Sequence, residues 1–245
     1  MSESKVLITG ISSGLGYGFA QAYLEDGWTV YGVSRRTPEN LARSFGAGQL
    51  RVRNLDLGEY DAIAPALGEL LSDVAPRLDL VILNAGILGE IEDLRTANIA
   101  TLRHTMDVNV WANKAILDTI FALRPAVAVD QVVAISSGAA VNGSRGWSGY
   151  SISKAALNML TMLYAQEVPE THFTALAPGL IDTAMQDYMS EKPDVKKFPS
   201  VQRLRDARGT AAMPDPYTAA RRIQALFSKI KQEIPSGAFA DVRKL

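Results

Sequence analysis

Tyr150 and Lys154 form the pair whose residue types and spacing most directly suggest chemistry. They stand four positions apart at the start of a stretch with helical periodicity, and residues i and i+4 share one face of a helix. A tyrosine near neutral pH is uncharged, with a pKa of about 10, and a neighbouring ammonium group lowers that pKa by favouring the phenolate. The pair can therefore exchange a proton with a carbonyl or alcohol oxygen as a general acid and base.

Ser137 lies thirteen positions before Tyr150, two residues after an apolar run that ends at Ile135. Its hydroxyl can hydrogen-bond a substrate oxygen on which negative charge develops. A tyrosine and a lysine at this spacing often form an ordinary surface pair. The serine at the end of the preceding strand, together with the glycine motif described next, makes a chance pairing a poor explanation.

The segment Thr9–Gly16 follows the first expected strand and opens the first expected helix, with the spacing G-x-x-x-G-x-G. Gly10 allows a sharp turn, Gly14 allows close approach of the backbone to a pyrophosphate, and Gly16 allows close packing of the helix on the sheet. The start of the helix offers free N–H groups and the positive end of its dipole to an anion. The residues expected to bind the phosphates of a dinucleotide are Gly10, Ser12, Ser13, Gly14, Leu15 and Gly16.

The second expected strand ends in Ser34-Arg35-Arg36. NAD would normally meet an acidic residue here, which bonds the ribose 2′-hydroxyl. Guanidinium groups suit a 2′-phosphate instead, through charge-assisted hydrogen bonds. A solvated arginine pair would not account for the missing carboxylate, so we expect the cofactor NADP(H).

The elements that position these residues alternate along the whole chain. Seven short apolar runs are typical of buried parallel strands: residues 5–9, 29–34, 50–54, 78–83, 131–135, 173–177 and 237–240. Segments with helical periodicity lie between them: residues 15–26, 39–45, 61–71, 101–123, 151–167 and 216–230. The alternation predicts an α/β protein, a doubly wound Rossmann-type three-layer sandwich around a mostly parallel seven-stranded sheet. With 245 residues, the chain suits a single NADP-binding domain over residues 1–245.

One segment departs from this alternation. Residues 186–215 are polar and proline-rich, and we expect them to be irregular. They follow the sixth strand, at the edge where open α/β sheets bind ligands. We interpret the segment as a substrate lid, with a surface excursion of no functional role as the alternative.

Composition excludes several classes of protein. The chain has 25 Lys and Arg against 26 Asp and Glu, without the concentrated positive charge that nucleic acids or membrane surfaces require. It has no cysteine and only two histidines, so disulfides, cysteine nucleophiles and multi-histidine metal sites are excluded, and we expect no metal. No segment matches a signal peptide or a membrane span, and we expect a cytoplasmic protein.

These motifs, in this order, resemble the short-chain dehydrogenase/reductase family along essentially the whole chain. The resemblance implies that Ser137, Tyr150 and Lys154 act with Asn109 as a catalytic tetrad, the Asn109 backbone carbonyl holding a water that links the lysine to a proton relay. It also implies that Tyr150 and Lys154 contact the cofactor. Further cofactor contacts implied by the resemblance are Asp56 and Leu57 beside the adenine, Asn84, Ala85 and Gly86 after the fourth strand, and Pro178, Gly179, Ile181 and Thr183 near the nicotinamide.

The last third of the chain resembles the sepiapterin reductase and benzil reductase group, through the run from Asp182 to Gln186 and the ending that contains Asp241. That resemblance implies that Asp241 could anchor a pterin, although strand-end aspartates also occur here for structural reasons. We expect Trp147, Met185, Tyr188 and Asp241 to shape the substrate site, or else the aromatic and methionine side chains to cover the core.

The sequence therefore predicts an NADPH-dependent carbonyl reductase that transfers hydride to a ketone, an α-diketone or a pterin side-chain carbonyl, with Tyr150 as general acid. The alternatives are an alcohol or steroid dehydrogenase working in the oxidative direction, and a non-catalytic NADP-sensing protein. Residues 101–123 and 151–167 are apolar around much of each helix, which predicts a homodimer or homotetramer through them. A monomer with a loop folded over these helices is the alternative.

Overall fold

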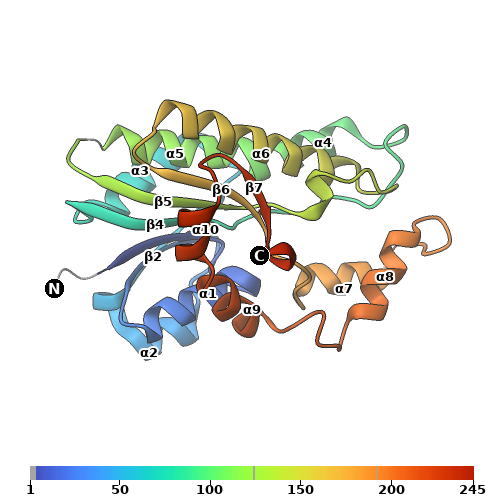
Figure 1. Ribbon diagram of the computed structural model, residues 1–245, viewed down its shortest axis with the longest axis horizontal. Coiled ribbons are helices and arrows are strands. Elements are labelled where there is room, and N and C mark those ends of the chain that lie inside the picture. The colour runs from blue at the N-terminus through green and yellow to red at the C-terminus, as the bar shows by residue number, and fades with distance from the viewer. Residues whose placement is uncertain (1–3, 124, 192) are drawn as a thin grey trace.

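The computed structural model describes residues 4–123, 125–191 and 193–245, and within them seven strands form one sheet in the order β3-β2-β1-β4-β5-β6-β7. All neighbouring strands run parallel (Figure 1). The strands are β1 (Lys5–Thr9), β2 (Thr29–Ser34), β3 (Leu50–Asn54), β4 (Arg77–Leu83), β5 (Ala128–Ile135), β6 (His172–Ala177) and β7 (Phe239–Asp241). The predicted doubly wound α/β fold is confirmed.

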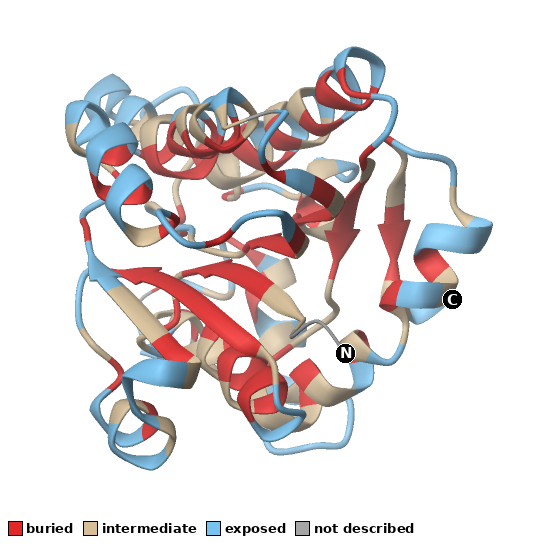
Figure 2. Ribbon diagram, turned by 90° about the vertical axis from the view of Figure 1, so that its left-hand side faces the viewer, coloured by how far each residue is buried: buried red, intermediate tan, exposed pale blue. Residues whose placement is uncertain are grey.

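Helices cover both faces of the sheet (Figure 1). One face carries α3 (Tyr60–Leu70), α5 (Ala112–Ala122) and α6 (Ser148–Glu167), and the other carries α1 (Gly14–Glu25), α2 (Glu39–Gln49), α9 (Pro216–Gln224) and α10 (Phe227–Glu233). Successive residues of a strand point to opposite faces, so Leu7 packs into one core while Val6 and Ile8 pack into the other. The strands are therefore buried between helices whose outer faces are exposed (Figure 2).

Two of the expected helices are divided. Residues 101–123 form α4 (Ile99–Met106), a wider π-helical turn (Asp107–Trp111) and then α5. The single helix expected over residues 216–230 is wrong, because α9 ends at Gln224 and α10 begins at Phe227. Buried Ile223, Phe227 and Ile230 continue at helical spacing across the break, so the apolar pattern does not reveal it.

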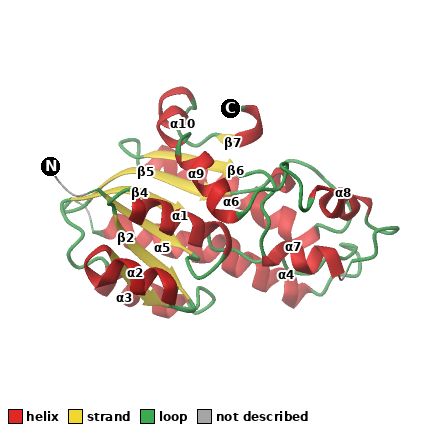
Figure 3. Ribbon diagram, turned by 90° about the horizontal axis from the view of Figure 1, so that it is seen from below, coloured by secondary structure: helices red, strands yellow, loops and turns green. Residues whose placement is uncertain are grey.

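The expected lid is not irregular, and this prediction is wrong. It includes most of α7 (Ala184–Glu191) and all of α8 (Pro199–Ala207), and these helices lie beyond the carboxyl ends of the strands, to one side of the sheet (Figures 1 and 3). The polar composition conceals these helices because few of their side chains are buried; Met189 and Val201 are among those that are. Pro199 starts α8, where a proline costs no helical hydrogen bond.

Short 3₁₀ turns at Gly138–Ala140 and Val242–Lys244 complete the elements. No helix in the described part of the chain is both long and apolar enough to cross a membrane.

Candidate active site

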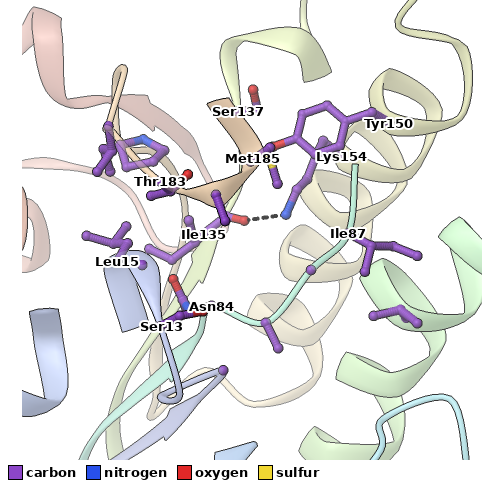
Figure 4. A pocket seen from close by; sticks show the side chains of 18 of the residues that line it. Ser13, Leu15, Asn84, Ile87, Ile135, Ser137, Tyr150, Lys154, Thr183 and Met185 are labelled. Atoms are coloured by element: carbon purple, nitrogen blue, oxygen red, sulfur yellow. Dashed lines mark hydrogen bonds between the residues drawn. The ribbon is translucent and has the colours of Figure 1, made fainter. Parts of the chain in front are cut away.

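A cavity of about 450 Å³ opens at the carboxyl ends of the strands, and it collects most of the predicted site residues (Figure 4). The predicted residues that line it are Gly10, Ser12, Ser13, Gly14, Leu15, Ser34, Arg35, Asp56, Leu57, Asn84, Ala85, Gly86, Ser137, Trp147, Tyr150, Lys154, Pro178, Gly179, Ile181, Thr183 and Met185. Gly16, Arg36, Asn109, Tyr188 and Asp241 are not among the residues lining it.

The glycine loop joins β1 to α1 and has the geometry of a phosphate cradle. Gly10 and Gly14 adopt left-handed backbone conformations, with φ of +79° and +59°, which other residue types rarely adopt. A Cβ atom at Gly16 would lie 2.3 Å from the Gly10 carbonyl oxygen, so the loop can pack on the helix only if residue 16 is glycine. Ser13 precedes α1 and its side chain makes no capping hydrogen bond. The loop thus presents backbone N–H groups and the serine hydroxyls to the cavity.

Asn84 ties the ends of β4 and β1 together beneath the cavity. Its side-chain Nδ2 donates to the Thr9 carbonyl at 2.9 Å, and its backbone N–H donates to the Thr9 hydroxyl at 3.0 Å. The N–H of Ala85 donates to the same hydroxyl at 2.9 Å. Thr9 therefore orients the segment 84–86, a role that we did not predict.

The two arginines that follow β2 differ in their position relative to the cavity. Arg35 lines the cavity and Arg36 does not, although both are exposed. The Ser34 hydroxyl is buried and donates to the Arg36 carbonyl at 2.6 Å, which holds the turn after the strand. His104 of α4 also lines the cavity, near Asp56.

Tyr150, Ser137 and Lys154 converge in the cavity from α6 and from the end of β5 (Figure 4). The Lys154 Nζ donates to the Ile135 carbonyl at 2.7 Å and lies 5.7 Å from the centre of the Tyr150 ring. Burial lowers the pKa of Lys154 from 10.5 to about 8. Burial raises the pKa of Tyr150, and the hydrogen bond with Ser137 lowers it in part. The net shift of Tyr150 is upward, opposite to the direction expected from the lysine, because burial is the largest influence.

Asn109 lies in the π-helical turn and clamps the loop after β4 to α6. Its Nδ2 donates to the Ile87 carbonyl at 2.8 Å and to the Ser153 hydroxyl at 2.9 Å, and its Oδ1 accepts from the Ile87 N–H at 2.8 Å. The Ser153 hydroxyl in turn donates to the Tyr150 carbonyl at 2.8 Å. The Asn109 backbone carbonyl accepts a hydrogen bond from Asn113 Nδ2 at 2.8 Å. The asparagine side chain therefore acts through backbone and Ser153 contacts rather than from the cavity wall.

Two of the expected substrate residues are directed elsewhere. The Tyr188 hydroxyl donates to Glu90 at 2.9 Å and thereby seats α7 on the loop before α4. The carboxylate of Asp241 is held by Arg243, with N–O distances of 2.9 and 2.6 Å. This ion pair lowers the pKa of Asp241 and occupies both carboxylate oxygens.

Several lining residues were missed by sequence reasoning. Those additional residues include Ile87, His104, Val108, Gln186 and Leu204. Ile87 directly follows the Asn84-Ala85-Gly86 segment, and His104 lies five positions before Asn109 on the preceding helix, so adjacency to known motifs could have indicated both. No motif identifies Leu204, since its position depends on how α8 docks.

Comparisons with known proteins agree with this geometry. The family model described as short chain dehydrogenase matches residues 4–194. The chain is 31% identical over 237 residues to a benzil reductase ((S)-benzoin forming) of Saccharomyces cerevisiae, covering 91% of this chain and 90% of the relative. It is 29% identical over 245 residues to the benzil reductase ((S)-benzoin forming) of Bacillus cereus, covering 95% and 96%.

Among solved structures, the short-chain dehydrogenase/reductase YIR035C of Saccharomyces cerevisiae superimposes with a TM-score of 0.85 at 21% identity, covering 98% of this chain and 96% of that one. The enzyme KRED1-Pglu gives a TM-score of 0.83 at 23% identity, with coverage of 97% and 100%. These two likenesses establish the fold. Together with the match to the family model and the 31% identical relative, they show that the chain belongs to the short-chain dehydrogenase family.

Proposed function

We propose that this oxidoreductase is an NADPH-dependent carbonyl reductase that acts on ketones and 1,2-diketones, with Tyr150 as the general acid. The observation that carries the proposal is one cavity in which Tyr150, Ser137 and Lys154 meet the glycine loop. Members of the family use nicotinamide cofactors, and two relatives of about 30% identity are named benzil reductases.

The residues present fit a dinucleotide. A Cβ atom at Gly14 would approach Thr183 to 3.3 Å and fill the space between the loop and the segment that follows β6, so glycine keeps this cradle open. Gly10 and Gly14 would contact the pyrophosphate, Arg35 the 2′-phosphate, and Thr183 the nicotinamide end. NADPH, when bound, supplies the hydride that reduces the carbonyl carbon.

The chain itself supplies the proton and orients the substrate. A tyrosine keeps its phenolic proton at neutral pH, and burial raises the pKa of Tyr150 further. Tyr150 can therefore donate this proton to the carbonyl oxygen, which becomes the alcohol. Ser137 can donate a hydrogen bond to the same oxygen as negative charge develops there. Lys154 places a charge near the tyrosine ring. Its hydrogen bond to the Ile135 carbonyl fixes the ammonium group.

The same observations bear on the alternative functions, an alcohol or steroid dehydrogenase and a non-catalytic NADP sensor. Tyr150 would act as the acid in reduction and as the base in the oxidation of alcohols or steroids, so its position fits either direction. We favour reduction because Arg35 lines the cavity and suits the 2′-phosphate of NADPH. A non-catalytic NADP sensor would not need both Tyr150 and Lys154 in the cavity. Because Asp241 is engaged by Arg243 and lies off the cavity wall, we favour ketones and diketones over pterin substrates.

A panel of carbonyl compounds tests the proposal. Benzil, butane-2,3-dione and sepiapterin are each incubated with NADPH, and its absorbance is followed. For Tyr150→Phe we expect a loss of about 10²–10⁴-fold in the reduction rate, with the dissociation constant for NADPH unchanged in a fluorescence titration. Most of the activity surviving in this variant would remove Tyr150 as the acid.

We also propose that two or four copies associate through α4, α5 and α6. Ile152, Met159, Met162 and Leu163 of α6 are about half exposed, as is Trp111 beside α5. Burying such side chains against a second copy removes apolar surface from water, which favours association.

A further inference from the structure

The cavity beyond Tyr150 is walled by apolar side chains from three separate segments. They are Ile87 after β4, Trp147 before α6, and Met185, Met189 and Leu204 from α7 and α8. Four of these five pack in one cluster with Tyr150: Trp147, Met185, Met189 and Leu204. The charged side chains among the described lining residues lie elsewhere: Arg35 and Asp56 come from other segments, and the Lys154 ammonium group is hydrogen-bonded to the Ile135 carbonyl.

Trp147 is the aromatic member of this wall, and its position is fixed by neighbouring contacts. It follows Gly146, whose backbone carbonyl accepts a hydrogen bond from the Glu92 N–H at 3.0 Å. Its ring centroid lies 5.9 Å from that of Tyr150, with the planes tilted by 55°. Its indole N–H donates to the Ser200 hydroxyl of α8 at 2.8 Å.

The hydrogen bond to Ser200 determines what Trp147 offers to a substrate. Since the indole N–H is already paired with Ser200, Trp147 offers the cavity its apolar ring and no hydrogen-bond donor. A flat aromatic group gains offset or tilted contact with such a ring, and thioether sulfurs such as those of Met185 and Met189 also favour aromatic neighbours. A small aliphatic group gains much less from the same wall.

We propose that Trp147 is a specificity-determining residue, which favours carbonyl compounds that carry an aromatic ring next to the reacting carbonyl, and that Ser200 is a positioning residue that holds its indole. This inference rests on the proposed carbonyl reductase activity. It also links substrate preference to the seating of the lid, because Ser200 belongs to α8 while Trp147 belongs to the body of the protein.

The test is the ratio of kcat/KM for benzil to kcat/KM for butane-2,3-dione, two diketones that differ in their aromatic rings. For Trp147→Ala we expect the ratio to fall about tenfold, since the ring contact and the buried area are lost together. For Ser200→Ala we expect a fall of about threefold, as for the loss of one hydrogen bond. Ser200→Thr keeps the hydroxyl and restores the ratio.

A double variant separates positioning from general loosening of the lid. Trp147→Phe removes the N–H donor, so adding Ser200→Ala to it should change the ratio no further, because the two residues act as one pair. Tyr188→Phe removes a different contact of α7, the hydrogen bond to Glu90, without changing Trp147, and should lower both kcat/KM values alike. Circular dichroism and NADPH titration check that each variant is folded.

The outcomes distinguish this inference from the proposed function. If the unmodified protein reduces both diketones but Trp147→Ala leaves the ratio unchanged, the specificity role is overturned while carbonyl reduction stands. If Tyr188→Phe lowers the ratio as much as Ser200→Ala does, the role of Ser200 reduces to lid closure and its positioning role is overturned. Reduction of neither diketone overturns both proposals.

Discussion

At the scale of single residues, Lys154 combines a charge with almost complete burial. It is 4% exposed, and its pKa falls to about 8 because the folded chain shields it from water. The unfolded chain keeps this proton up to about pH 10.4. Between these values the unfolded state binds more protons than the folded state, so the contribution of Lys154 to the free energy of unfolding rises with pH.

Replacing Lys154 by methionine should therefore stabilise the protein while removing activity. At pH 7 the buried charge lowers the free energy of unfolding of the wild-type protein by about 3 kcal/mol. The variant regains this amount, less the contribution of the hydrogen bond to Ile135 that it loses. We expect a higher free energy of urea unfolding than wild type at pH 7, and a smaller difference at pH 10. The exposed Lys196→Met serves as the control, and an equal difference at both pH values would contradict the assigned cost.

Arg35 and Arg36 offer a second comparison between single residues. Arg35 lines the cavity and Arg36 does not, so Arg35→Ala should raise the KM for NADPH by about tenfold or more, the value of one charge-assisted bond. The KM for NADH should hardly change, and the matched variant Arg36→Ala should have the smaller effect. Equal use of NADH and NADPH by the unmodified protein would rule out the recognition of a 2′-phosphate.

At the scale of elements, the seating of α7 and α8 depends on how closely Phe198 approaches the loop before α6. Gly146 has φ of +97°, and a Cβ atom there would lie 2.6 Å from the Phe198 ring. Phe198 is buried in the same cluster as Met189 and Val201. The seating of α7 and α8 therefore requires a residue without a side chain at this turn.

Gly146→Ala should displace α7 and α8 without disturbing the glycine loop. The left-handed conformation alone costs about 1 kcal/mol for alanine, and the collision with Phe198 adds to it. We expect a several-fold higher KM for the carbonyl substrate and faster proteolysis within residues 184–207, with little change in NADPH affinity. Gly143→Ala, which meets no atom within 4 Å, is the matched control; identical behaviour of the two variants would show that the contact is unimportant.

At the scale of the whole molecule, the fold exposes an apolar stripe on the helix that carries Tyr150 and Lys154. Leu157 and Tyr164 of α6 face the core, while Met159 and Leu163 are each 53% exposed. Pairing two copies of this face would also fix the helix that positions the active-site residues.

Light scattering at micromolar concentration should therefore give at least twice the 26.5 kDa of one chain. Charged substitutions, Met159→Glu with Leu163→Glu, should produce monomers with reduced activity. Leu94→Glu changes an exposed apolar residue outside these helices and should leave the mass unchanged. A fully active species of 26.5 kDa would contradict the proposed association.

Much of the fold, above all the bounds of the strands, could be predicted from the sequence. The bounds of β1, β2 and β3 are those predicted, and β4, β5 and β6 begin one to three residues earlier. Buried parallel strands require uninterrupted apolar runs, which stand out against the helices between them. The spacings of Thr9–Gly16 and of Tyr150 with Lys154 likewise identified local geometry, because a turn or one helical face depends on near neighbours.

The remaining features depend on how distant elements pack. The turn held by Ser34 decides which of Arg35 and Arg36 reaches the cavity. The docking of α7 decides whether Tyr188 faces the substrate or Glu90. Likewise, Asp241 forms an ion pair with Arg243, and Leu204 of α8 lines the cavity. Composition and periodicity describe which residues an element can bury, but the direction of each side chain is set by contacts between segments far apart in the chain, and these form when the elements pack together.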